Sequence, residues 1–106
     1  MKSLAIAFAA AAVLSCSLQA RAQSSGEDLA KASGCLACHT MDKKLIGPGY
    51  KEIANKYRND KSAAANLEKK VKEGGKGVWG DIPMTPNAHV KDADIKTIVA
   101  WILTLK

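Results

Sequence analysis

The sequence Cys35-Leu36-Ala37-Cys38-His39 decides how the rest of the chain is interpreted. Two cysteines three positions apart lie on one side of a single helical turn. The CxxCH pattern is the c-type haem attachment motif, in which the two thiols form thioethers with the two vinyl groups of one porphyrin. The adjacent histidine then gives its imidazole to the iron. We therefore expect one haem c, bound covalently through Cys35 and Cys38, with His39 as an axial ligand.

The first part of the chain predicts an export signal. Met1-Lys2 is a short basic start, and residues 4–14 form an uninterrupted apolar run. This run is too short for a transmembrane helix, which needs about 20 residues. The pattern Ala20-Arg21-Ala22 that follows is typical of a signal cleavage site. We therefore predict that residues 1–22 are removed as a signal peptide and that residues 23–106 form one haem-binding domain in the periplasm.

Cys16 falls within this predicted signal. One interpretation is a lipoprotein, with residues 13–16 as a lipobox and Cys16 lipidated. The leucine directly before the serine fits a lipobox poorly, and the good cleavage site downstream favours loss of Cys16 with the signal. The remaining chain then has two cysteines, both in the CxxCH motif, so we expect no structural disulfide in this exported protein.

Lysine dominates the charge of the chain. The formal net charge is +6, and removal of Lys2 and Arg21 with the signal leaves +4. The lysines are spread along the sequence, which is typical of solvated helix faces, and the functional alternative is steering toward an acidic patch on a redox partner. Because no basic stripe with interleaved aromatic residues is present, and because export is expected, we do not expect nucleic-acid binding.

The mature domain is too small to form a strong hydrophobic core alone. Residues 23–106 number 84 and include only four aromatic side chains. A domain of this size usually needs additional stabilisation from a disulfide, a metal or a cofactor. A covalently bound haem supplies a cross-link and a large apolar surface, so we expect the apoprotein to be largely unfolded.

Hydrophobic periodicity predicts helices, and because no stretch alternates with a period of two, we expect no β-sheet. A capping box of Ser24 and Glu27 would start a first helix at residues 25–33. A second is expected at residues 50–57. The last is expected at residues 92–105, with an apolar stripe of Ile95, Ile98, Val99, Ile102 and Leu105.

A third helix lies between these, and two loops complete the chain. A cap at Asp60 or Ser62 would start this helix, which should continue to about residue 73 and stop at two glycines. Its inward face would carry Ala64, Leu67 and Val71. Residues 40–49 and 76–90 should be loops, and Leu45-Ile46 in the first is an apolar pair expected near the haem. The second loop is long for so small a domain, which usually indicates a function.

The second axial ligand decides between electron transfer and open-iron chemistry. Met41 lies too close to His39 to reach the opposite face of a haem. Met84 lies 45 residues after His39 in the long loop, between prolines that restrict the backbone. His89 is the competing ligand, although its position before the last helix favours the surface. We expect Met84 to bind the iron, and a thioether ligand raises the reduction potential.

These residues resemble the small bacterial monohaem cytochromes c-551 and c-552, also called cytochrome c8. The resemblance rests on the CxxCH motif, on Gly47-Pro48, on the run GVWGDIPMTPN at residues 77–87, and on WILTLK at residues 101–106. It covers essentially all of residues 23–106. It implies an all-α protein with a compact cytochrome c fold of about four helices around one covalently bound haem.

The resemblance also implies roles for individual residues. His39 and Met84 would be the two axial ligands, and the carbonyl of Pro48 would bind the other ring nitrogen of the histidine. Trp79 would donate its N–H to a haem propionate. Asn87 would lie near the methionine sulfur and tune it.

Two positions depart from the family pattern. Thr85 stands where a second proline is common, and Lys91 stands where a serine or similar cap often starts the last helix. Both positions concern the stiffness of the loop and the entry into the helix. Neither belongs to the ligand set.

The expected function is that of a diffusible single-electron carrier, not an enzyme. It would shuttle electrons between a membrane or periplasmic donor and a terminal reductase or oxidase, as a monomer without stable membrane insertion. An open-haem enzyme or gas sensor is the alternative, and it requires a labile Met84. A thiol or zinc module of Cys35, Cys38, His39 and His89 is disfavoured, because zinc sites rarely place a histidine directly after the second cysteine and no βαβ context is visible.

Overall fold

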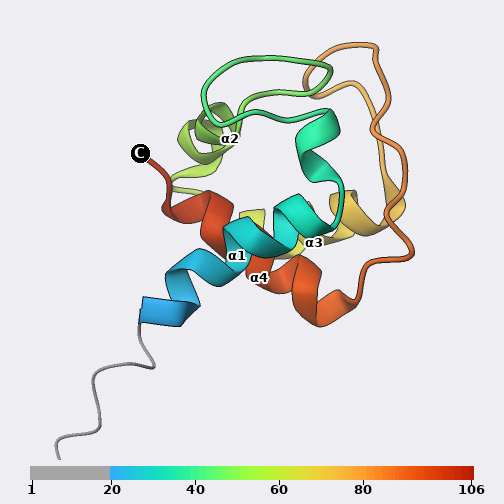
Figure 1. The fold of residues 1–106 in the computed structure, drawn as a ribbon. Helices are drawn as coiled ribbons and strands as arrows, with labels where there is room; N and C mark the ends of the chain where they lie inside the picture. The colour runs from blue at the N-terminus through green and yellow to red at the C-terminus, as the bar shows by residue number, and fades with distance from the viewer. Residues whose placement is uncertain (1–19) are drawn as a thin grey trace, which may run out of the picture.

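The computed structural model describes residues 20–106, which form four α-helices and one short 3₁₀ turn (Figure 1). The helices are α1 (Ala20–Ala32), α2 (Tyr50–Tyr57), α3 (Ala63–Glu73) and α4 (Asp92–Thr104), and the 3₁₀ turn η1 (Cys35–Ala37) follows α1. Within these residues the β contacts are two isolated bridges, His39 with Lys44 and Gly75 with Met84. No helix in this part of the chain has the length and hydrophobicity that crossing a bilayer requires. The all-α prediction is confirmed.

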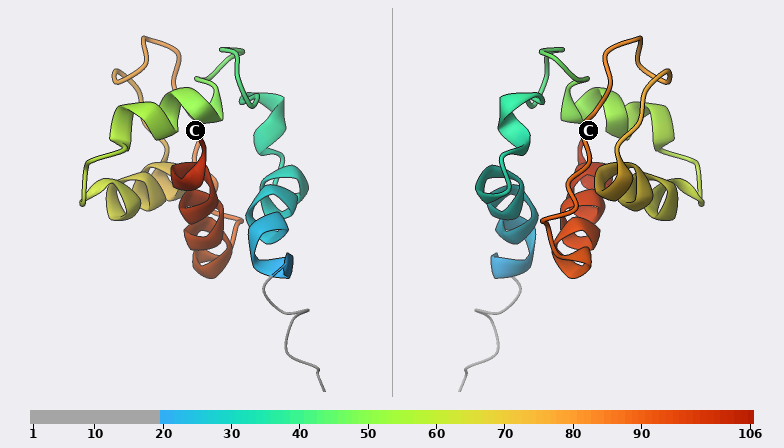
Figure 2. Two further views of the ribbon diagram at one scale, coloured as in Figure 1. Left: turned by 90° about the vertical axis from the view of Figure 1, so that its left-hand side faces the viewer. Right: turned by 90° about the vertical axis from the view of Figure 1, so that its right-hand side faces the viewer.

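Helix α4 is the element against which the others pack. It contacts α1, α2 and α3, and Figure 2 shows it between α1 and α3. The apolar stripe predicted for it is confirmed, because four of its members are buried: Ile95, Ile98, Val99 and Ile102. The two aspartates of its first turn suit the positive N-terminal end of the helix.

The inward faces of α2 and α3 follow the sequence, with one correction. The periodicity predicted for α2 is confirmed, with Tyr50, Ile53 and Ala54 buried. In α3 the buried alanine is Ala63, whereas Ala64 is exposed, so the inward position predicted for Ala64 is wrong. Side chains four apart share a helix face, and the face that carries residues 67 and 71 therefore begins at residue 63.

The ends of α3 depend on local side-chain and glycine geometry. Before the helix, the carboxylate of Asp60 accepts hydrogen bonds from the amide and the hydroxyl of Ser62, at 2.9 and 2.6 Å. These bonds hold the turn that leads into the helix and lower the pKa of Asp60. At the other end Gly74 has a φ of 75° and a ψ of −173°, a conformation that residues with a side chain rarely adopt, and its amide donates to the carbonyl of Lys70 at 2.8 Å.

Helix α1 begins earlier than the sequence predicts. The expected start lay directly after Ser24, but the helix runs from Ala20, so Ser24 lies inside it rather than at its cap. The preceding residues 20–23 (Ala-Arg-Ala-Gln) are good helix formers, and the helix continues through them. Residues 1–19, including Cys16 and most of the predicted signal, lie outside the residues that the structure describes. Cleavage and lipidation therefore stay predictions.

Gly26 allows α1 to approach α4 closely. A Cβ atom at this position would collide with the Cβ of Trp101 and lie 2.9 Å from its Cγ and 3.0 Å from the main-chain oxygen of Thr97. The contact between the first and last helices therefore depends on the missing side chain.

We expect Gly26→Ala to destabilise the holoprotein. Alanine normally favours a helix over glycine by up to about 1 kcal/mol, but overpacking against a rigid neighbour costs about 1–3 kcal/mol. Denaturant unfolding measures the difference. Asp28→Ala on the exposed side of the same helix is the control, with a change within about 0.5 kcal/mol. A stabilised Gly26→Ala variant would show that α1 can move away from α4 without cost.

Candidate haem site

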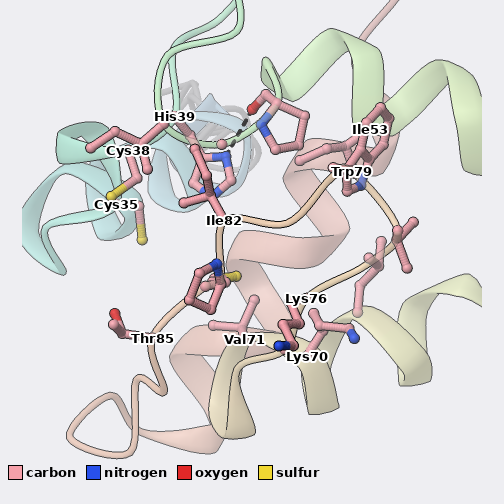
Figure 3. Close-up of a pocket in the computed structure, with 18 of the residues that line it drawn as sticks. Cys35, Cys38, His39, Ile53, Lys70, Val71, Lys76, Trp79, Ile82 and Thr85 are labelled. Carbon is pink, nitrogen blue, oxygen red and sulfur yellow. Dashed lines mark hydrogen bonds between the residues drawn. The ribbon is translucent and has the colours of Figure 1, made fainter.

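A cavity of about 370 Å³ opens between η1, the three helices α2, α3 and α4, and the two long loops. Apolar side chains from the helices form its walls, among them Ile53, Val71 and Ile98. All seven site residues predicted from the sequence line it: Cys35, Cys38, His39, Pro48, Trp79, Met84 and Asn87. Segments that are far apart in the sequence therefore meet at one site, part of which Figure 3 shows in close-up.

The turn η1 presents both cysteines to this cavity. Gly34 precedes the turn with a φ of 82°, a left-handed conformation that glycine adopts without strain. The amides of Cys38 and His39 both donate to the carbonyl of Cys35, at 3.2 and 3.1 Å. Cys35 and Cys38 consequently lie next to each other on one side of the site (Figure 3). This turn places two thiols where they can hold one planar cofactor at two points.

The surroundings of Cys35 differ from those of a reactive thiol. Before haem attachment, burial raises the pKa of the Cys35 thiol, a hydrogen bond with its own backbone partly opposes the rise, and the charge of Cys38 adds to it. Reactive cysteines have lowered pKa values instead. His89 is exposed and does not line the cavity. Within residues 20–106, no three His, Cys, Asp or Glu side chains are placed to hold a metal ion.

His39 is fixed from two directions. Its Nδ1–H donates to the carbonyl oxygen of Pro48 at 2.8 Å, drawn as a dashed line in Figure 3. Tyr50 stacks on the imidazole, with ring centroids 5.5 Å apart and an interplanar angle of 24°. Trp101 in turn meets Tyr50 edge to face, with centroids 5.2 Å apart. Because Nδ1 is engaged, Nε2 is the nitrogen that remains available to a metal.

Tyr50 carries a buried hydroxyl beside the cavity. The residue is 2% exposed, and its hydroxyl has no hydrogen-bond partner within the described residues. Burial raises the pKa of Tyr50, and negative charge on Cys35 and Cys38 would raise it further, so the phenol stays neutral. A buried polar atom without a partner requires an explanation, and a group bound in the adjacent cavity would supply one.

Met84 is held by the residues that follow α3. Its amide donates to the carbonyl of Gly75 at 2.7 Å, and the amide of Gly75 donates to the Met84 carbonyl at 3.1 Å. A side chain at Gly74 would collide with the carbonyl oxygen of Met84. Gly74, the first of the two glycines predicted to stop the helix, therefore also makes room for the methionine segment.

Trp79 and Asn87 both line the cavity but have different surroundings. Trp79 is partly exposed, and the Nζ of Lys56 lies 5.6 Å from its ring centroid. The side-chain amide of Asn87 donates to the carbonyls of Val71 and Thr85, both at 3.2 Å. Both of its N–H groups thus bind the main chain. These bonds tie the loop to α3, and the expected position of Asn87 near the methionine sulfur stays a prediction.

Other residues near the site show what the sequence pattern missed. Met41 packs against the core and does not line the cavity. Of the apolar pair expected near the haem, Ile46 lines the cavity and Leu45 does not. The stacking of Tyr50 on His39 had no local signal, because the two rings come together only through the fold. The lining also includes three lysines that no sequence motif distinguishes: Lys44, Lys70 and Lys76.

Gly47 offers a test of how tightly the imidazole is held. A Cβ at this position would lie 2.6 Å from Cε1 and 2.9 Å from Nδ1 of His39. Gly47→Ala is therefore expected to push the ring away from the Pro48 carbonyl and to lower the free energy of unfolding by about 1–3 kcal/mol. Denaturant unfolding of the holoprotein measures the loss, and the NMR signal of the Nδ1 proton reports the hydrogen bond. Lys43→Ala, at an exposed lysine of the same loop outside the cavity lining, is the control, and equal results for the two variants would contradict the expectation.

The residues around the cavity fit a covalently attached haem. They provide mostly apolar walls, two adjacent thiols and an imidazole with one free nitrogen, together with a thioether on a separate loop. These donors are the ones that c-type haem proteins use for attachment and axial ligation.

Comparison with known proteins identifies the family. The sequence model of the Cytochrome c family matches residues 23–106. Cytochrome c-552 of Nitrosomonas europaea is 53% identical over 79 residues, which cover 74% of this chain and 77% of that protein. Cytochrome c-551 of Allochromatium vinosum is 53% identical over 77 residues, which cover 73% and 82% of the two chains. The crystal structure of wild-type Nitrosomonas europaea cytochrome c552 matches with a TM-score of 0.73 at 52% identity, and covers 76% of this chain and 99% of that one. The chain therefore belongs to the cytochrome c family, whose members bind haem c covalently through the cysteine spacing that Cys35 and Cys38 have.

Proposed function

We propose that this protein is a periplasmic single-electron carrier, with His39 and Met84 as axial ligands, that shuttles electrons between respiratory redox proteins. The observation that carries the proposal is that both side chains line one cavity and that each residue is held by a hydrogen bond to the main chain of a neighbouring segment. His39 is bound through Nδ1 to Pro48 at 2.8 Å, and Met84 is bound through two main-chain hydrogen bonds to Gly75. Haem c supplies a one-electron iron couple when it is bound.

Ligation on both faces suits electron transfer better than catalysis. Two anchored ligands leave no open position for a gas or a peroxide. They also move little between oxidation states, which keeps the reorganisation on electron transfer small. The imidazole of His39 gains basicity from its bond to Pro48, and the thioether of Met84 favours the reduced iron and raises the potential.

The start of the family match supports export. It begins at residue 23, directly after the predicted cleavage site at Ala22. In the oxidising periplasm the two cysteines would be engaged in thioethers and no third cysteine would remain to form a disulfide.

The mouth of the cavity provides a surface for brief docking. Three of its apolar lining residues are at least half exposed: Ile46, Val78 and Ile82. Lys44 and Lys76 line the same cavity and are exposed to solvent. An apolar patch with positive charge around it fits a redox protein whose docking face has acidic side chains at its edge.

Replacement of Met84 tests the axial ligand. We expect Met84→Ala to retain the covalent haem, to lower the reduction potential substantially, and to bind carbon monoxide rapidly and stoichiometrically in the reduced state. Binding to the wild type should be slow, because Met84 must leave first. The measurements are intact mass, potentiometry and carbon monoxide titration at neutral pH.

His89→Ala is the matched control for this experiment. His89 is exposed and lies outside the cavity, so its replacement should leave both the potential and the carbon monoxide titration unchanged. Rapid, stoichiometric binding of carbon monoxide to the wild type would favour an open-haem enzyme or gas sensor instead. If Met84→Ala behaved as the wild type while His89→Ala opened the iron, His89 would be the ligand.

Charge reversal at the cavity mouth tests the docking surface. Oxidation of the ferrous protein by hexacyanoferrate(III), a small anion, should slow roughly threefold in Lys76→Glu at low ionic strength and recover at high salt. Lys61→Glu makes the same change in net charge at an exposed lysine outside the cavity lining, and it should slow the reaction less. Equal rates for the two variants would mean that only the total charge matters.

A further inference from the structure

The loop that carries Met84 is attached to the end of α3 at three successive points. Each point is three residues further along the loop, and each uses a different partner near the C-terminus of the helix. The pairs are Met84 with Gly75, Asn87 with Val71, and Val90 with Lys72. The first two are formed by the main chain, at 2.7 and 3.1 Å for Met84 and 3.0 Å for Asn87. Only the third is formed by a charged side chain.

The segment before Met84 has no comparable attachment. Within residues 76–83, the main-chain hydrogen bond outside helices joins Gly77 to Gly80, at 2.9 Å, and so lies inside the segment itself. The position of Met84 consequently depends on its own pairing and on the attachments that follow it. The end of the loop at residue 90 is where the last of these acts.

Lys72 differs from a typical surface lysine. Its Nζ donates to the main-chain carbonyl of Val90 at 2.7 Å and pairs with the carboxylate of Asp92 at 2.9 Å. The lysine side chain is 35% exposed, whereas that of Asp92 is 88% exposed. Val90 is buried and packs with Ile95 and Val99 of α4. Lys72 therefore connects the end of α3 to the first turn of α4 across the end of the methionine loop.

We propose that Lys72 is a positioning residue for the sixth ligand, whose ammonium keeps the end of the loop closed and thereby sets how often Met84 leaves the iron. The inference rests on the proposed ligation by Met84. A hydrogen bond from a charged donor is stronger than a neutral one, and its removal deprives a partly buried carbonyl of a partner. The ion pair with the exposed Asp92 contributes less, because solvent screens it.

Ligand exchange on the ferric holoprotein measures how often the methionine leaves. At saturating imidazole, the binding rate is limited by departure of Met84. We expect Lys72→Met, which keeps an apolar stem, to bind about tenfold faster than the wild type, the factor that corresponds to a change of ~1.4 kcal/mol. Lys72→Arg, which retains a charged donor, should stay within roughly twofold of the wild type. Asp92→Asn should lie between the wild type and Lys72→Met.

Lys69→Met is the matched control, because Lys69 is an exposed lysine of the same helix that makes neither contact. Amide hydrogen exchange supplies a second readout that does not depend on the iron. The Met84 amide should exchange about tenfold faster in Lys72→Met than in the control. The amides of Ile98 and Ile102 in the core of α4 should not change by more than they do in Lys69→Met.

The outcomes separate this inference from the proposed function. If the wild type binds imidazole as soon as it is mixed, Met84 is not the ligand and the proposed function fails. If the wild type is slow and Lys72→Met is no faster than Lys69→Met, the function stands and the role of Lys72 is wrong. Equal acceleration of exchange at Met84, Ile98 and Ile102 would also overturn it, because Lys72 would then stabilise the whole fold rather than the loop.

Discussion

The helices of this protein pack around a space that their own side chains do not fill. Tyr50, Ile53, Ile98 and Ile102 belong to the main core cluster, and each also lines the 370 Å³ cavity. One side of the hydrophobic core therefore faces a hollow rather than another protein layer. Apolar surface stabilises a fold by about 25 cal/mol per Å² only when it is removed from water. A small domain with this architecture depends on a bound apolar group, and the two cysteines of η1 make the attachment of that group permanent.

The two sides of the site are built by different means. On the histidine side, the ring of His39 is held by the carbonyl of Pro48, nine residues along the chain, and by the ring of Tyr50, eleven residues along. On the methionine side, the pairing of Met84 with Gly75 also spans nine residues, but the loop is further attached to α3 by contacts that span sixteen and eighteen residues. If His39 and Met84 bind the iron as proposed, the hold on Met84 depends on contacts with residues far from it in the sequence. Substitutions distant from the iron would then change ligand exchange on the methionine side.

The same loop carries both the proposed ligand Met84 and part of the proposed docking surface. Val78 and Ile82 are exposed at the cavity mouth, and Met84 follows them after a single proline. Positive φ angles at Gly77 (100°) and Gly80 (123°) allow the tight turns that bring this segment back toward α3. The part of the loop before Met84 is therefore the part that a redox partner would meet. The part after it fixes the loop to the body of the protein.

The sequence alone was sufficient for the features that depend on local chemistry. These features are the CxxCH motif within one turn, the helical spacing of apolar residues in α2 and α4, and a methionine between prolines. Each of them acts over a few residues, so the sequence alone indicates the local structure that follows from it. It was wrong or silent where a position depended on neighbours in space. Ala63 rather than Ala64 faces the core. No pattern indicated that Tyr50 stacks on His39, that Asn87 binds the main chain of α3, or that Lys72 connects α3 to α4. Each of these contacts forms only when the helices fix the distance between segments. The sequence around a lysine or a tyrosine is the same whether or not the fold brings a partner next to its side chain.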